Sequence, residues 1–277
     1  MELMSLAIAY GFEAIGFDRD AFDITNQKTV EKMIEQYAPD VVINAAAYTA
    51  VDQAENDTEA AWVVNATAMG YLAETCAKHD ISLVHISTDY VFDGSKQGEY
   101  REEDAVSPLG VYGESKLAGE KAVCKLCDNH YILRTSWVFS THGNNFVKTM
   151  LRLGRERDEL GVVADQFGKP TSAREIARII YELLSSQKHA WGTYHIVQPD
   201  TTSWHGFAQM IFKEAETQGM KLQLETLHAI TTKEYPTSAK RPQNSALNCS
   251  KLEETFGLKM KPWQESLSEV IKELKDV

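Results

Sequence analysis

A tyrosine and a lysine four positions apart, Tyr112 and Lys116, have the residue types and the spacing of a proton-donating pair. In a helix these positions lie one turn apart on the same face. Thr88, a hydroxyl at the end of an apolar run, would face them. A phenol with an ammonium beside it and a hydroxyl opposite can polarise a carbonyl group and protonate its oxygen. The spacing alone is weak, because about one such pair is expected by chance, so its structural context decides.

The charge on Lys116 should affect the acidity of Tyr112. A free phenol has a pKa of about 10, and an ammonium one turn away stabilises the phenolate. Lowering that pKa by about three units would take roughly 4 kcal/mol and would bring the acid toward working pH. We therefore predict that Lys116 lowers the pKa of Tyr112.

Strands and helices alternate along most of the sequence. Apolar runs predict strands at residues 13–18, 40–47, 82–88, 131–138 and 192–197. Helix-compatible stretches, several with a capping residue, predict helices at residues 1–10, 26–37, 58–79, from 112 onward, 145–157, 171–186, 203–218 and after Pro262. The short joints between them predict an α/β fold with a doubly wound parallel sheet.

The ends of the predicted strands carry the residues of chemical interest. Asp18, Ala47, Thr88 and Trp137 each lie at or near the end of a different predicted strand. In a doubly wound sheet, ligands bind outside the carboxyl ends of the strands. We therefore expect one crevice to collect these residues.

The sequence divides into two parts by its pattern. Residues 1–164 carry most of the alternation and are expected to form a Rossmann-like dinucleotide-binding domain. From about Asp165 the pattern loosens. Residues 165–277 are expected to form a smaller substrate-binding lobe that is interleaved with the sheet.

Composition excludes several classes of function. The chain has 277 residues, 43% of them hydrophobic, with a formal net charge of -12 and a pI of about 5.2. This acidity makes nucleic acid an improbable partner. No apolar run approaches the roughly 20 residues that a membrane span requires. The start of the sequence lacks the pattern of a signal peptide, so we expect a cytoplasmic protein with no membrane partner.

Two of the four cysteines, Cys124 and Cys127, have the spacing of a redox or zinc pair. No second pair completes a metal site, and both fall late in the helix that begins near Tyr112. We interpret them as packed thiols without a metal.

A dinucleotide-binding sheet of this order opens with a strand and a glycine-rich turn that meets the pyrophosphate. The sequence begins instead with the first predicted helix, so we expect this central strand and its turn to be missing. Either the start as given lies downstream of the real one, which we favour, or the chain as written is not a competent nucleotide binder. We expect poor binding of NADH and NADPH by this polypeptide.

With these features in place, the sequence resembles the extended short-chain dehydrogenases/reductases. The segments that carry the resemblance span essentially the whole chain, at residues 44–52, 87–94, 112–120, 134–137, 143–146, 165–171 and 241–242. Together they are specific to one branch, which reduces the C4 keto group of dTDP-4-dehydro-L-rhamnose to dTDP-L-rhamnose. The resemblance implies NADPH or NADH as cofactor and a dTDP-sugar as substrate.

The resemblance also implies roles for individual residues. Tyr112 would be the proton donor, assisted by Lys116 and Thr88, and both Tyr112 and Lys116 would also contact the cofactor. Thr88 would bind substrate too, together with Asp89, Trp137 and Arg241. The remaining residues on the cofactor side would be Asp18, Asp23, Ile24, Ala47, Tyr48 and Thr49.

Several alternatives stay open. Asp18 can bind a ribose 2′-hydroxyl while Arg19 beside it favours a 2′-phosphate, so NADH and NADPH both remain candidates. In one branch of the family glutamates hold a metal at a dimer interface, and Arg174 stands at the matching place, so we predict no metal. A monomer or a homodimer is expected. The rival functions are a non-catalytic binding protein on the same fold and a sister reductase that gives another 6-deoxysugar.

Overall fold

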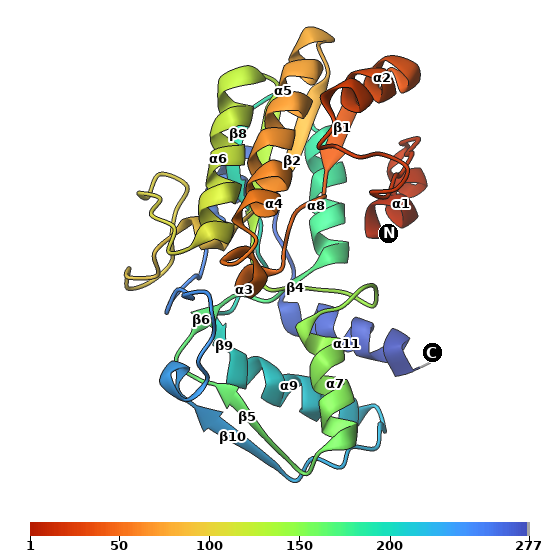
Figure 1. The fold of residues 1–277 in the computed structure, drawn as a ribbon. Helices are drawn as coiled ribbons and strands as arrows, with labels where there is room; N and C mark the ends of the chain where they lie inside the picture. The colour runs from red at the N-terminus through yellow and green to blue at the C-terminus, as the bar shows by residue number, and fades with distance from the viewer. Residues whose placement is uncertain (276–277) are drawn as a thin grey trace.

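A computed structural model describes residues 1–275 of the chain. It has two lobes, one above the other in the view of Figure 1. The upper lobe is built on a four-stranded sheet and the lower lobe on three helices and a pair of strands.

The sheet of the upper lobe is entirely parallel. Its strands are β1 (Val41–Asn44), β2 (Ser82–Thr88), β3 (His130–Thr135) and β8 (Gly192–His195), in the order β1-β2-β3-β8. The predicted α/β fold with a parallel sheet is confirmed. Because all four strands run the same way, their carboxyl ends lie along one edge of the sheet.

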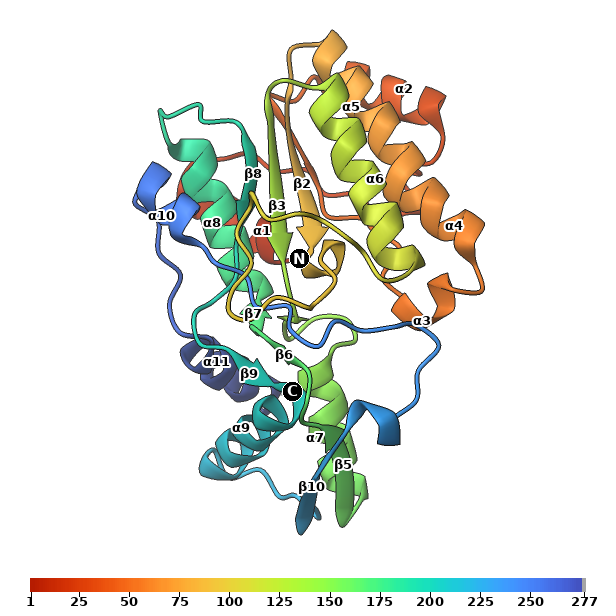
Figure 2. The same ribbon diagram turned by 90° about the vertical axis from the view of Figure 1, so that its left-hand side faces the viewer.

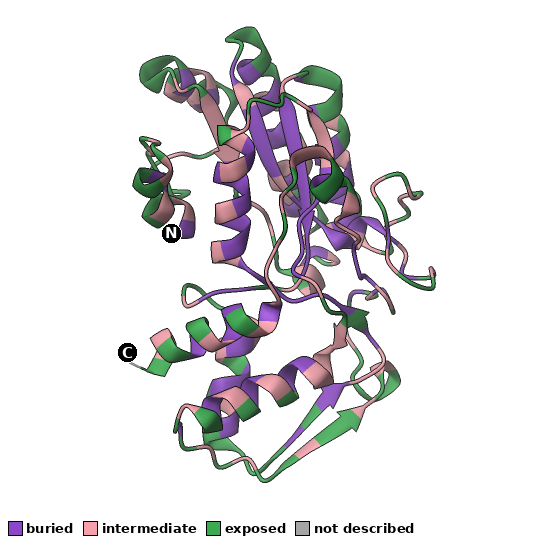
Figure 3. Ribbon diagram, turned by 180° about the vertical axis from the view of Figure 1, so that it is seen from behind, coloured by how far each residue is buried: buried purple, intermediate pink, exposed green. Residues whose placement is uncertain are grey.

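Helices cover both faces of this sheet (Figure 2). One face carries α2 (Gln27–Tyr37), α5 (Ala68–Lys78) and α6 (Val111–Leu126), and the other carries α8 (Ala173–Ser185) and α1 (Glu2–Leu6). Leu83 faces the first set while its neighbour Val84 faces the second. This alternation is the two-residue period of a strand that is buried on both sides. In Figure 3 the central strands of the sheet have the colour of buried residues along most of their length.

The predicted helix over residues 58–79 is interrupted. It consists of α4 (Thr58–Trp62), a π-helical turn (Val63–Thr67) and α5. A π-turn inserts an extra residue into the helical repeat and is often found at functional sites. Here it contains Asn65, whose side chain is buried and donates to Ser115 Oγ of α6 at 3.1 Å.

The prediction of a strand at residues 13–18 is wrong. These residues have no regular structure, and Ile15 and Phe17 remain exposed. A strand needs a neighbour for its N–H and C=O groups. Within residues 1–275, β1 pairs with β2 alone, and no strand lies along its other edge. The preceding helix is confirmed as α1 and the 3₁₀ turn Ala7–Tyr10, which ends at Gly11 with φ of 78°.

The lower lobe packs three helices around one hydrophobic cluster. These are α7 (Phe146–Glu156), α9 (Trp204–Thr217) and α11 (Trp263–Lys275). Beside them β5 (Glu159–Val163) pairs in parallel with β10 (Thr226–Ile230). The sequence did not reveal this pair, because β10 is largely exposed and has no clear apolar period.

Short elements complete the chain and join the lobes. Two small sheets pair β4 (Val138–Phe139) with β7 (Thr171–Ser172) and β6 (Phe167–Gly168) with β9 (Thr202–Ser203). The remaining helical segments are α3 (Val51–Ala54), α10 (Ser250–Phe256) and the 3₁₀ turns η3 (Asp89–Val91) and η4 (Thr232–Glu234). The predicted strand over residues 131–138 is thus divided between β3 and β4.

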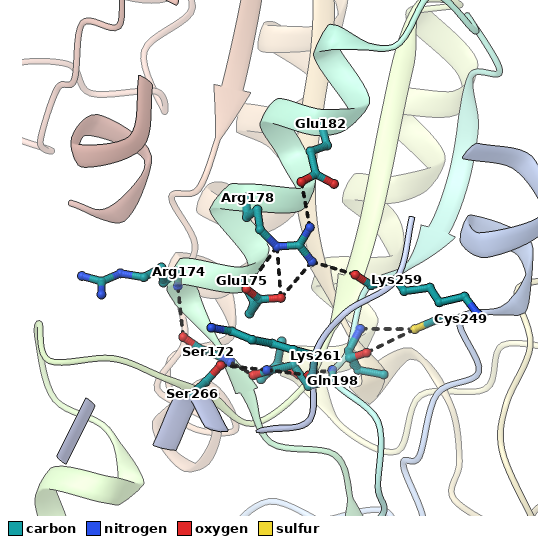
Figure 4. Close-up of polar contacts among 12 residues, drawn as sticks. Ser172, Arg174, Glu175, Arg178, Glu182, Gln198, Cys249, Lys259, Lys261 and Ser266 are labelled. Carbon is teal, nitrogen blue, oxygen red and sulfur yellow. Dashed lines mark hydrogen bonds and ion pairs between the residues drawn. The ribbon is translucent and has the colours of Figure 1, made fainter. Parts of the chain in front are cut away.

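Gln198 connects the two lobes (Figure 4). Its side chain is completely buried, accepts from the backbone N–H of Ser172 at 2.8 Å and donates to Lys261 O at 2.9 Å and Ser266 Oγ at 2.8 Å. Nearby, Arg178 donates to Lys259 O at 2.8 Å and so ties α8 to the segment before α11.

None of the helices in residues 1–275 combines the length and the apolar character that crossing a bilayer requires.

Replacing Gln198 should loosen the junction between the lobes. We predict that Gln198→Ala lowers the free energy of unfolding by about 2–4 kcal/mol, because buried backbone groups of two segments lose their partners. Denaturant unfolding measures this. Gln27→Ala is the control, since Gln27 is exposed and its side chain makes only a 3.4 Å bond to Glu31. Equal effects of the two substitutions would contradict the assignment.

Candidate functional site

Tyr112 lies in the first turn of α6, beside the end of β2. Its ring meets the ring of Tyr90 edge to face, with centroids 5.4 Å apart. Burial raises the pKa of Tyr112 to about 12, although a hydrogen bond with Thr88 acts in the opposite direction. The structure therefore brings Thr88 and Tyr112 together, and the phenol keeps its proton at neutral pH.

The predicted effect of Lys116 on Tyr112 is wrong in this structure. Lys116 is buried, and its Nζ donates to the backbone oxygen of Ile86 in β2 at 2.7 Å. Burial lowers the pKa of Lys116 to about 8, against an opposing effect of Glu120. Burial disfavours the charged form of both groups, so the phenol becomes a weaker acid and the ammonium a stronger one.

Two glycines allow α6 to lie this close to its neighbours. A Cβ on Gly113 would overlap the carbonyl oxygen of Tyr90, and one on Gly119 would overlap the carbonyl oxygen of Asn65. At the start of the helix, the Glu55 carboxylate accepts the N–H of Val111 at 2.9 Å. A carboxylate at a helix N-terminus satisfies an unpaired donor and interacts favourably with the helix dipole. These contacts position the turn that carries the phenol.

A buried ion pair fixes the middle of α6. Glu120 accepts from Arg134 Nε at 2.9 Å and Nη2 at 2.7 Å, and from Ser87 Oγ at 2.5 Å. Both charged side chains are almost completely buried. The pair therefore joins α6 to β2 and β3 directly behind the site.

Asp89 follows Thr88 and is also buried. Burial raises the pKa of Asp89 to about 6, while the nearby Ser245 hydroxyl and the bond from Thr88 Oγ1, 3.0 Å long, partly offset this effect. Its second carboxylate oxygen, Oδ2, has no hydrogen-bond partner among the described residues. A buried acceptor without a partner is costly unless a ligand donates to it.

The loop after β1 holds the residues expected on the cofactor side. Asn65 binds the backbone of Tyr48 twice, accepting from its N–H at 2.8 Å and donating to its oxygen at 3.1 Å. Ala47 is half-buried and Thr49 is exposed. The same Asn65 contacts Ser115, so one side chain connects this loop to α6.

Asp18 and Asp23 lie in exposed turns. Asp18 accepts from the N–H of Ala21 at 3.0 Å, and Asp23 accepts from the N–H and hydroxyl of Thr25. These bonds lower the pKa of Asp23. Ile24 is half-buried and packs on the core beneath α2 and α5. The carboxylates of Asp18 and Asp23 thus accept hydrogen bonds from residues of their own turns.

Trp137 has an unusual backbone and a firmly held ring. Its φ of 47° is in the left-handed region, which is strained for a bulky residue. The indole stacks on Trp204 with centroids 3.6 Å apart and lies directly against Gly168, where a Cβ would overlap it. Trp137 follows the end of β3, whose Thr135 pairs with Thr88.

Arg241 is already engaged with a carboxylate. Its Nη2 donates to Asp52 Oδ2 at 2.6 Å and its Nη1 to Asp52 Oδ1 at 3.1 Å. This pairing lowers the pKa of Asp52. It attaches the loop around Arg241 to α3, the helix that follows the Tyr48 loop in the sequence.

The residues around Tyr112 fit a nicotinamide dinucleotide. Ala45 and Ala46, which follow β1, are small and exposed at the carboxyl edge of the sheet, where such cofactors bind. Lys116 has three N–H groups when charged and uses one on Ile86. It therefore retains donors for a ribose hydroxyl.

Arg174 forms ion pairs rather than an acidic metal site. Its guanidinium donates to Glu2 at 3.2 Å and to Glu273 at 2.7 Å. Within residues 1–275 no group of three or more His, Cys, Asp or Glu side chains is arranged to hold a metal. Cys124 is exposed with its sulfur 3.6 Å from His130, and Cys127 is buried. The absence of a metal stays a prediction.

Sequence reasoning missed four residues that support the site, Glu55, Asn65, His85 and Glu120. His85 stood out as a polar side chain in an apolar strand, but its partners come from distant parts of the chain. The others are polar side chains in helices or, for Glu55, in the turn after α3, and in the sequence they resemble ordinary surface residues.

Comparison with known proteins identifies relatives over nearly the whole chain. Residues 1–276 match the family described as RmlD substrate binding domain. A dTDP-4-dehydrorhamnose reductase of Aggregatibacter actinomycetemcomitans is 45% identical over 263 residues, 94% of this chain and 90% of the relative. The crystal structure of such a reductase from Clostridium acetobutylicum has a TM-score of 0.93 at 39% identity and covers 99% of this chain and 95% of that one. A Bacillus anthracis structure in complex with NADP has a TM-score of 0.92 at 37% identity, covering 98% and 94%.

The glycines of α6 provide a test of the close packing. We predict that Gly113→Ala lowers the free energy of unfolding by about 1–3 kcal/mol, because the added methyl group must displace the backbone at Tyr90. Denaturant unfolding measures the change. Gly70→Ala on α5 is the matched control. It meets no atom within 4 Å and should stabilise the helix by about 0.5–1 kcal/mol. A stabilising Gly113→Ala would show that α6 can move away.

Proposed function

The chain belongs to the RmlD substrate binding domain family, and we propose that it reduces the C4 keto group of dTDP-4-dehydro-L-rhamnose to give dTDP-L-rhamnose, with NADPH or NADH as cofactor. The observation that carries the proposal is the half-buried phenol of Tyr112, which lies beside Thr88 and one helical turn from Lys116. Relatives that bear the name of this reductase match over more than nine-tenths of the chain.

Tyr112 is the acid of the proposed reaction. A nicotinamide dinucleotide, when bound, supplies a hydride to the carbonyl carbon. The Tyr112 phenol has a pKa of about 12 and is therefore protonated at neutral pH, and it gives this proton to the carbonyl oxygen. Thr88 donates a hydrogen bond to the same oxygen and stabilises the charge that develops there.

Lys116 holds the ribose of the cofactor and stabilises the tyrosinate left after proton transfer. Its pKa of about 8 keeps most of the amine charged at neutral pH. That cation is then available when negative charge appears on Tyr112.

Four side chains bind the substrate in this proposal. Thr88 binds the carbonyl oxygen, and Asp89 accepts a hydrogen bond from a sugar hydroxyl through Oδ2, which no described residue satisfies. Trp137 packs its indole against the sugar, supported from behind by Trp204. Arg241 directs the N–H groups not used by Asp52 toward the diphosphate.

The cofactor lies along the carboxyl ends of the strands. Ala47, Tyr48 and Thr49 contact its nicotinamide side, and Asp18 and the Asp23–Ile24 pair its adenosine side. We assign residues 1–164 to cofactor binding and residues 165–277 to the substrate, with α7 and β5 of the first part packed into the second. Whether the chain is a monomer or a homodimer is measured directly by light scattering.

A direct assay tests the proposed function. The purified chain is mixed with dTDP-4-dehydro-L-rhamnose and either NADPH or NADH, and cofactor oxidation is followed with identification of the sugar product. We expect dTDP-L-rhamnose with at least one cofactor, supplied at a concentration high enough to offset the poor cofactor binding that the sequence predicts. Binding of the cofactor without turnover would favour the non-catalytic alternative, and a different 6-deoxysugar would favour the sister reductase.

Removing the proton donor should abolish most of the turnover. We predict that Tyr112→Phe lowers kcat by roughly a hundredfold or more with little change in KM, since the ring still packs on Tyr90. Steady-state kinetics measure both constants. Tyr235→Phe, at an exposed tyrosine, is the control. A kcat within a few-fold of the parent would remove Tyr112 from the mechanism.

The protonation of Asp89 should change the KM for the substrate. Since its pKa is raised to about 6, Asp89 is a carboxylate above that pH and loses its negative charge as the pH falls through it. We predict that KM rises in the parent below about pH 6. Asp89→Asn should raise KM at neutral pH about tenfold and remove this acidic rise. An unchanged pH profile in the variant would assign the rise to another group.

A further inference from the structure

His85 lies in the middle of β2, directly beneath Lys116. Its ring is completely buried. The Nδ1 atom is 3.1 Å from Asn44 Nδ2, and the Nε2 atom is 3.4 Å from Lys116 Nζ. The imidazole therefore connects β1 to the lysine of α6, and the proposed mechanism gives it no role.

The orientation of Asn44 fixes the protonation of the His85 ring. The Asn44 side chain accepts from the N–H of Ala46 at 3.2 Å and donates to the Ala46 carbonyl, also at 3.2 Å. Turning the amide over would oppose donor to donor and acceptor to acceptor. Its Nδ2 therefore faces both His85 Nδ1 and Met69 Sδ, each at 3.1 Å. Because an amide nitrogen cannot accept, the contact with His85 is a hydrogen bond only when Nδ1 of the ring is the acceptor. Burial and the nearby Lys116 lower the pKa of His85, so the ring is neutral.

A neutral imidazole with Nδ1 as acceptor carries its proton on Nε2. That N–H points at Lys116 Nζ, which can accept it only as a neutral amine. A charged ammonium would place donor against donor. In either form Nζ keeps its bond to Ile86.

We propose that His85 is a positioning residue that acts through Lys116: its Nε2–H, held in that tautomer by Asn44, faces the lysine nitrogen and favours its neutral form, while the carbonyl of Ile86 holds that nitrogen against β2 in both forms. The inference rests on the proposed function only for the catalytic importance of Lys116.

Few charged groups surround this amine. From α6 itself comes Glu120, which favours the ammonium but is neutralised by Arg134 of β3. The η3 turn contributes Asp89, which acts on Tyr112. The π-turn and α5 face this part of α6 with Asn65 and Met69, which carry no charge. His85 is thus the ionisable group whose ring directly faces the amine.

Lysine side-chain NMR tests the inference without any assay of activity. In a sample with labelled lysines, one Cε signal should titrate at a pH of about 8 and disappear in Lys116→Met. We predict that His85→Gln raises this midpoint by about one unit, because a rotatable amide can turn its oxygen toward the ammonium. His195→Gln, at a second buried histidine on β8, should leave the midpoint unchanged.

The kinetics should follow the NMR titration. Turnover in the parent should fall as the pH rises through about 8, where Lys116 loses its charge. In His85→Gln that fall should move upward by the same amount as the lysine signal. An unmoved lysine signal in a folded His85→Gln would overturn the inference and leave the proposed reductase intact. If the parent is inactive but the lysine signal still shifts in His85→Gln, the inference stands and the proposed reductase function is overturned.

Two further measurements cover a His85→Gln variant that does not fold. Nitrogen NMR of the parent should show His85 protonated on Nε2, and a ring protonated on Nδ1 overturns the inference. Asn44→Asp should move the His85 proton to Nδ1, turn Nε2 into an acceptor and raise the Lys116 midpoint. An unchanged midpoint in folded Asn44→Asp also counts against it.

Discussion

The buried ion pair between Glu120 and Arg134 is the contact on which the site depends most. It joins α6 to β3, and through Ser87 to β2, with both charges out of solvent. Breaking such a pair from one side leaves an unpaired buried charge and costs about 3–5 kcal/mol. Glu120 lies one turn from Lys116 and two from Tyr112, on the same side of the helix. The pair therefore sets the rotation of α6 that turns the lysine and the phenol toward the end of β2.

Burial acts on the two catalytic candidates in opposite senses. It raises the pKa of Tyr112 to about 12 and lowers that of Lys116 to about 8, so the resting site carries less charge than the motif suggests. The familiar argument from sequence considers only the attraction between phenolate and ammonium. Desolvation, which the sequence cannot reveal, raises the pKa of Tyr112 instead, and Lys116, whose nitrogen is bound to the carbonyl of Ile86, is not among the groups that shift it.

The sequence predicted what depends on local pattern and missed what depends on distant partners. The strands β2 and β3 were predicted because an apolar run needs no particular neighbour to be recognised. Residues 13–18 have the same apolar character but no strand beside them, so the pattern alone was misleading. The Tyr112 and Lys116 pair was visible from its spacing. The stacking of Trp137 on Trp204 was not, because Trp204 lies 67 positions further along the chain.

Two asparagine side chains bind backbone N–H and C=O groups of the loop after β1, as a neighbouring strand would. Asn44 binds both backbone groups of Ala46, and Asn65 binds both backbone groups of Tyr48. A loop held at alternate residues by side-chain amides has its backbone donors and acceptors satisfied without secondary structure. Each amide also reaches toward α6, Asn44 through His85 and Asn65 through Ser115. The same two side chains therefore fix the loop and connect it to the helix that carries Tyr112 and Lys116.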